Sequence, residues 1–163
     1  MEVTPNQIKA IFAEIAEKHK DISDFHWGDF LDAVSKKRKA LYPLLVCTVQ
    51  PSPMSKHTIG FNVVVSIWDK YNEDDWEQLD DVFNDTFLTC VDIKNILLSY
   101  RFEDLFSAEF TSNVTPTKHK GQDLSAGHWF NVNFGIYDEA NHCGIPIEDS
   151  FEFLERGKDY VPN

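Results

Sequence analysis

The sequence predicts an α+β fold in which two helices pack on one face of an antiparallel or mixed four-stranded sheet. Three observations support this: apolar residues at helical spacing near the N-terminus, an acidic stretch with the same spacing in the middle, and two segments of strict apolar–polar alternation. The predicted order is helix, strand, strand, helix, strand, strand. With 163 residues, 42% of them apolar, the chain can bury a core as one domain, which we assign to residues 1–138.

The first helix has a clear start. Thr4 is a suitable N-cap, Pro5 fits the first helical position, and Gln7 stands where a capping-box partner belongs. Apolar residues at helical spacing continue to about Lys20. Residues 21–40 are predicted to be irregular or weakly helical.

Two strands are expected next. The stretch LYPLLVCTVQP, residues 41–51, is apolar on both faces and predicts a central strand. From Thr58 to Trp68 apolar residues alternate with Gly60, Asn62 and Ser66, which predicts a strand with one buried face.

The second half repeats the pattern of helix followed by strands. Asn72 is expected to cap a helix that continues to about Ser99, and the acids after it suit the positive end of the helix dipole. Strands over residues 109–117 and 128–137 form a hairpin, which leaves a basic sequence in the hairpin loop: Lys118, His119 and Lys120.

Charge is distributed unevenly over a chain whose net charge is −12. Residues 69–109 hold twelve acids and three bases (−9), and residues 138–163 hold seven acids and two bases (−5). Phosphate binding needs many cations, so this surface argues against tight binding of nucleic acid. One basic run remains: Lys36, Lys37, Arg38 and Lys39. It fits pairing with the acidic helix or acidic tail of another copy, a solvated loop, or a contact with DNA.

No established catalytic motif is present, since the sequence has no P-loop, GxGxxG, GxSxG or HExxH. His142 and Cys143 are adjacent, but neighbouring residues of a strand point to opposite faces and rarely bind one zinc ion. The acids after Asn72 lack the glycine and terminal glutamate of an EF-hand. We therefore expect no cofactor, no metal and no enzymatic activity.

The sequence DFHWGDF, residues 24–30, is the best remaining candidate for chemistry. His26 stands between two aspartates, as in a general-base dyad. The alternative is a loop that docks its aromatic residues on the core, with Gly28 making the turn. A small α+β enzyme using His26, Asp29 or His128, and a monomeric binding module, stay open as alternative functions.

Residues 139–163 form an acidic and apolar C-terminal arm without a regular pattern. Its apolar residues are Ile145, Ile147, Phe151, Phe153, Leu154, Tyr160 and Val161. The arm either folds back on its own domain or lies on a neighbouring subunit.

Three widely spaced cysteines without a CxxC pair indicate reduced thiols in an intracellular protein. No run of about 18 apolar residues predicts a membrane span. The N-terminus does not resemble a secretory signal.

The layout resembles the tail-terminator and neck-ring proteins of tailed bacteriophages, most closely those of crAss-like and related phages of gut Bacteroidota. The shared features cover residues 4–138: an amphipathic first helix, a YPL strand start at Tyr42, a long alternating strand, an acidic helix and the closing VTPTKHKGQDLSAGHWFNVNFGI. The chain departs from this pattern in its basic run at residues 36–39 and in its longer tail.

The resemblance implies a structural virion protein without a cofactor. Such proteins form rings of six or twelve copies around the DNA channel, contact portal, neck or tail proteins, and assemble in the bacterial cytoplasm. An acidic channel would let DNA pass during ejection without specific binding. The candidate subunit-interface residues are Lys36, Lys37, Arg38, Lys39, Lys118, His119, Lys120, Phe151, Phe153, Leu154 and Tyr160.

Overall fold

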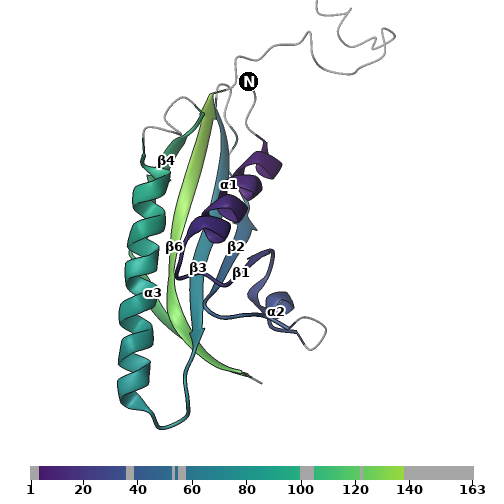
Figure 1. The fold of residues 1–163 in the computed structure, drawn as a ribbon. Coiled ribbons are helices and arrows are strands. Elements are labelled where there is room, and N and C mark those ends of the chain that lie inside the picture. Colours follow the sequence, from purple (N-terminus) through teal and green to yellow (C-terminus); the bar gives the residue numbers. More distant parts are fainter. Residues whose placement is uncertain are drawn as a thin grey trace, which may run out of the picture.

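A computed structural model describes residues 4–35, 39–52, 54, 58–99, 105–121 and 123–137. The described part of the chain forms an α+β fold with three helices and one mixed six-stranded sheet (Figure 1). The helices are α1 (Pro5–Lys18), α2 (Phe30–Ala33) and α3 (Trp76–Leu97). The strands are β1 (Asp24–Trp27), β2 (Leu44–Gln50), β3 (Thr58–Lys70), β4 (Ser107–Phe110), β5 (Thr115–Lys120) and β6 (Leu124–Tyr137). The α+β class is confirmed, whereas the predicted four strands and their order are wrong. The predicted C-terminal arm lies outside the described residues.

The sheet is built around two long strands. Its order is β1-β2-β3-β6-β4, with β5 also paired to β6, and only β1 and β2 are parallel. The strands β3 and β6 pair over their full common length, from Thr58 with Tyr137 to Lys70 with Ser125. The predicted alternation of β3 is confirmed, and the strand extends slightly beyond its predicted end.

The first helix forms as its sequence predicts. The backbone N–H of Thr4 donates to Oε1 of Gln7 at 2.7 Å, and the N–H of Gln7 donates to Oγ1 of Thr4, so the capping box is complete. The apolar face then buries Ile8, Phe12, Ile15 and Ala16.

Residues 24–33, predicted to be irregular or weakly helical, contain the strand β1 and the short helix α2. Four residues are too short for alternation to identify a strand, and β1 depends on its parallel pairing with β2. Phe25 and Trp27 pack against the main core, while Phe30 stacks on Trp68 with 4.0 Å between ring centroids. Gly28 makes the turn with a φ of 145°. The docking interpretation of DFHWGDF is therefore confirmed for these aromatic residues.

The predicted strand over residues 109–117 is two strands in the structure. Both β4 and β5 pair with β6, at different points along one edge. Between them the backbone N–H of Asn131 donates to Oγ of Ser112 at 2.7 Å, in place of a strand carbonyl. This side-chain contact interrupts the ladder, which a pattern of apolar residues does not reveal.

The second long helix starts later than predicted. Asp75, not Asn72, is the N-cap, and its carboxylate accepts from the N–H of Gln78 at 3.0 Å. The N–H of Asn72 donates instead to the side chain of Gln78. The buried side of α3 holds Leu79, Val82, Thr86, Thr89, Cys90, Ile93 and Leu97.

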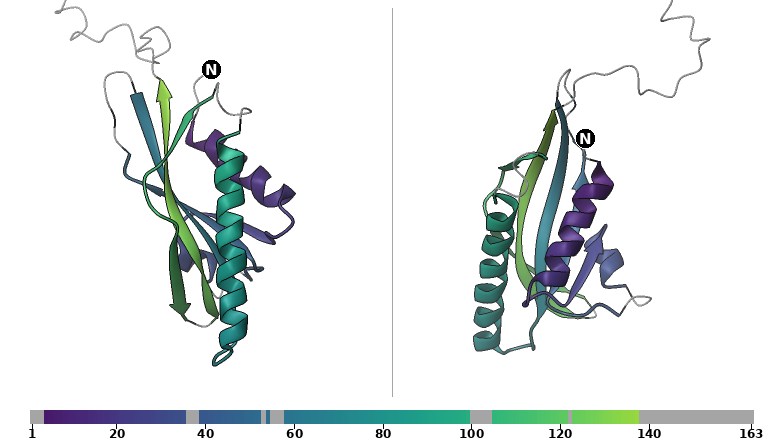
Figure 2. Two further views of the ribbon diagram at one scale, coloured as in Figure 1. Left: turned by 90° about the vertical axis from the view of Figure 1, so that its left-hand side faces the viewer. Right: turned by 45° about the horizontal axis from the view of Figure 1, so that its top comes forward.

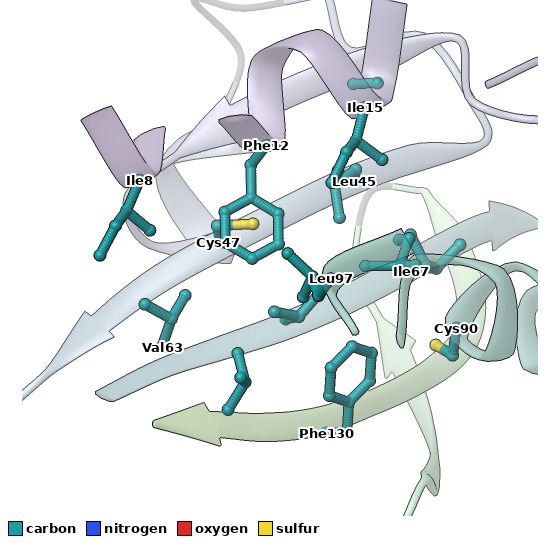
Figure 3. Packing of buried hydrophobic residues seen from close by; sticks show 14 of the residues in the cluster. Ile8, Phe12, Ile15, Leu45, Cys47, Val63, Ile67, Cys90, Leu97 and Phe130 are labelled. Atoms are coloured by element: carbon teal, nitrogen blue, oxygen red, sulfur yellow. The ribbon is translucent and has the colours of Figure 1, made fainter. Parts of the chain in front are cut away.

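The main core lies between the sheet and both long helices. Ile8 and Phe12 of α1 and Leu97 of α3 pack on Leu45 and Val63 of the sheet (Figure 3). Since both helices bury residues in one cluster, they lie on the same face, as predicted, with α3 running along β6 (Figure 2). No helix in the described part of the chain is long and apolar enough to cross a membrane.

The second face of the sheet is covered at one end only. There α2 and the residues around it bury Ala33, Leu44, Val46 and Trp68 in a smaller cluster. We call the remaining part of this face, which no described element covers, the outer face.

Candidate functional site

The basic residues at the hairpin do not form its tip. Lys118, His119 and Lys120 are the last residues of β5 and pair with residues 124–126 of β6. The expectation that the loop begins at Lys118 is wrong, because polar residues at a sheet edge continue the strand without an apolar pattern.

Because side chains alternate along a strand, Lys118 and Lys120 point to one face of the sheet and His119 points to the other. Lys118 Nζ lies 5.7 Å from the ring centroid of Trp76 and 5.5 Å from that of Phe83, beside the acidic start of α3. His119 lies edge-on to Phe30 on the other face, with 5.0 Å between centroids. Each of the two therefore already has contacts within its own chain, and a role in subunit contacts stays a prediction.

The remaining candidate interface residues lie mostly outside the described part of the chain: Lys36, Lys37, Arg38, Phe151, Phe153, Leu154 and Tyr160. Lys39 is described and exposed. It lies in the chain between α2 and β2, and α2 is on the opposite side of the sheet from α3 (Figure 1).

His128, one of the candidate catalytic residues, is 7% exposed on the core face. Its Nδ1 lies 3.0 Å from Oγ1 of Thr86, and the rings of Phe83 and Phe87 meet it edge-on. The Thr86 hydroxyl donates to the carbonyl of Val82 at 2.7 Å, so its oxygen accepts from the Nδ1–H of a neutral imidazole. Burial lowers the pKa of His128, which also favours the neutral ring. The arrangement is that of a satisfied core histidine.

The lowered pKa of His128 predicts a pH-dependent stability. The unfolded chain takes up this proton near the ordinary pKa of 6.5, before the folded chain does, so the free energy of unfolding falls as the pH drops below that value. We expect wild type to lose more stability than His128→Gln between about pH 7.5 and about pH 5.5 in urea unfolding. Glutamine keeps a donor for Thr86 and does not titrate. Equal losses in both proteins would show that His128 does not contribute.

No group of three His, Cys, Asp or Glu side chains gathers as a metal site within the described ranges. Cys47 and Cys90 are free and buried, and burial raises the pKa of the Cys90 thiol to about 12. They pack as small apolar residues, which matches the sequence-based interpretation of reduced thiols for these two positions.

One uncovered surface is the exposed side of α3. Trp76 is 70% exposed and Leu88 is 51% exposed, and Phe87 and Leu98 also lie largely in solvent. The helix has five acids and one base, and all the acids are exposed: Glu77, Asp80, Asp81, Asp85 and Asp92. Large apolar side chains among acids are typical of a protein-contact surface rather than of a purely solvated helix.

The outer face is the second uncovered surface, and its chemistry differs. Cross-strand pairing brings together Gln50 with Asn62, Asn62 with Asn133, and Val64 with Asn131. A shallow groove of about 530 Å³ runs over this region. It is lined by Phe30, Thr48, Gln50, Pro51, Asn62, Val64, Ser66, Trp68, Trp129 and Asn131, none of which is charged.

Three acceptors on the outer face lack a protein partner. The Oδ1 atoms of Asn62, Asn131 and Asn133 are shielded from solvent and have no hydrogen-bond partner among the described residues. Buried acceptors of this kind are ordinarily paired, so these three are unusual. The alternation of β3 and β6 in the sequence predicts that these asparagines share one face of the sheet. A polar face can be either solvated or a contact surface, and the sequence pattern does not distinguish the two.

No protein-family model matches the chain, and comparison with curated proteins finds no match.

Proposed function

We propose that the chain is a structural subunit of a ring in the neck or tail of a tailed bacteriophage, a tail terminator or head–tail connector. The ring has six or twelve copies, encloses the channel through which DNA passes without specific binding, and contacts portal, neck or tail proteins in the virion. The sequence resemblance over residues 4–138 motivates the class of protein.

The observation that supports assembly is the placement of two complementary surfaces. The helix α3, with its acidic and apolar exposed side, lies at one side of the molecule, and α2 lies at the opposite side (Figure 1). Lys39 ends the basic run of residues 36–39. A contact between two different surfaces is heterologous, and repeated around an axis it closes into a ring. Opposite charges across such a contact set which surfaces meet.

A charge-swap experiment tests this contact. One variant changes Lys36, Lys37, Arg38 and Lys39 to Glu, and the other changes Glu77, Asp80, Asp81 and Asp85 to Lys, so that each reverses the net charge of one surface. We expect each variant alone to associate at least about tenfold more weakly than wild type, because its contact then joins like charges. An equal mixture should assemble again, since alternating subunits restore opposite charges at every contact, and six and twelve are both even. Mass photometry measures the assemblies.

Glu14→Lys with Glu17→Lys is the matched control, because it changes two exposed charges of α1 outside the proposed contact. This control should assemble like wild type. If the equal mixture of the two swapped variants stays dissociated, the proposed pairing of surfaces is wrong.

A further inference from the structure

The outer-face groove has room and no charged lining residue, so it can receive another segment of polypeptide. The partly buried side chains of Asn62 and Asn131 line this groove, and their amide groups suit the backbone of an extended segment. Trp129 and Val64 on the same face are half-buried and offer apolar contact. An extended segment with apolar side chains toward the sheet can make both kinds of contact.

Residues 145–153 of this chain fit that description. Ile145, Ile147, Phe151 and Phe153 all occupy odd positions, and the positions between them hold Pro146, Glu148, Ser150 and Glu152. The arm as a whole has no regular pattern, but this stretch has a period of two, interrupted only by Asp149, as an extended segment with one apolar side does.

Charge decides between the two uncovered surfaces. Residues 138–163 carry seven acids and two bases, a net charge of −5. The exposed side of α3 carries acids as well and would repel this segment. The outer-face groove has no charged lining residue, so it would not repel the acidic segment.

Chain direction favours the outer face of a neighbouring copy. The strand β6 ends at Tyr137, four residues beyond Asn133, and runs away from the groove toward the end of the sheet (Figure 1). A segment that kept this direction would leave its own subunit. The 26 residues after Tyr137 span up to about 85 Å when extended, about twice the length of a 14-residue strand.

We infer that residues 138–163 of one copy dock on the outer face of the next copy, with the apolar side of residues 145–153 against Val64 and Trp129. The inference rests on the proposed ring function, because it requires a neighbouring copy. Of the two placements that the sequence leaves open for the arm, the inference selects the one on a neighbouring subunit.

Photo-crosslinking of the full chain tests this docking. Phe151 is replaced by the crosslinking amino acid benzoylphenylalanine, and Glu152, on the opposite side of an extended segment, is replaced in the matched control. Equal amounts of ¹⁴N- and ¹⁵N-labelled protein are assembled together and irradiated. Mass spectrometry then shows which peptides are joined and whether they come from two copies.

We expect position 151 to join peptides of β3 or β6 that contain Val64 or Trp129, with mixed isotopes, and at several times the yield of position 152. Adding Val64→Glu, which places a negative charge against the acidic segment, should reduce this yield at least about tenfold, whereas Val64→Thr should not.

Crosslinks to α3, equal yields at positions 151 and 152, or links within single copies would each overturn the inference. If rings form but position 151 links elsewhere, the docking is wrong and the proposed function stands. If the protein remains monomeric and the links are intramolecular, both are wrong.

Discussion

Replacing Gly127 with alanine is expected to cause one of the two largest losses of stability in this chain. Gly127 lies in β6 opposite Trp68 of β3. A Cβ at this position would overlap the carbonyl oxygen of Ile67 and would lie 2.8 Å from its carbonyl carbon. These are backbone atoms in the centre of the sheet, so neither strand can move without breaking the ladder. We expect Gly127→Ala to lower the free energy of unfolding by about 3 kcal/mol or more.

Gly121→Ala is the matched control. Its added methyl group would meet the ring of His119 in an exposed turn, and a side-chain ring can rotate away. Urea unfolding should therefore show a small change for Gly121→Ala and a large one for Gly127→Ala. Similar stabilities for the two variants would mean that β3 and β6 do not approach as closely as the structure has them.

The second large effect is expected from Phe12→Ala. Phe12 is fully buried between α1 and the sheet, and its ring lies 6.0 Å from that of Phe134 and 6.3 Å from that of Trp27 (Figure 3). Its removal leaves a cavity where a helix, β1 and β6 meet. We expect a loss of about 3–5 kcal/mol in the free energy of unfolding, a large part of the roughly 5–15 kcal/mol typical of a domain.

Phe12→Leu should cost clearly less, because it keeps most of the apolar volume. Thermal and urea unfolding of the two variants measure the difference. If Phe12→Ala unfolds like wild type, α1 does not contribute to the core in the way described here.

The elements with strong local signals could be predicted from sequence. The helix α1 has its own capping box, and β3 and β6 are long enough for alternation to identify them. The short strands β1 and β4 could not, because four residues show too little alternation. Their formation depends on pairing with β2 and β6, which is tertiary information.

The candidate site shows the same limit. The sequence drew attention to Lys118–Lys120 because three basic or titratable residues are adjacent, yet strand alternation separates them onto two faces. The asparagines of the outer face are distant in sequence and become neighbours only through the register of β3 and β6.

The mass and shape of the purified full-length protein test the proposed function most directly. Mass photometry combined with negative-stain microscopy would measure both in one sample. The proposed function predicts particles of six or twelve copies, each copy of 18.8 kDa, that appear as uniform rings with a central hole. A monomer that forms no such rings, either alone or with neck and tail proteins, would contradict it.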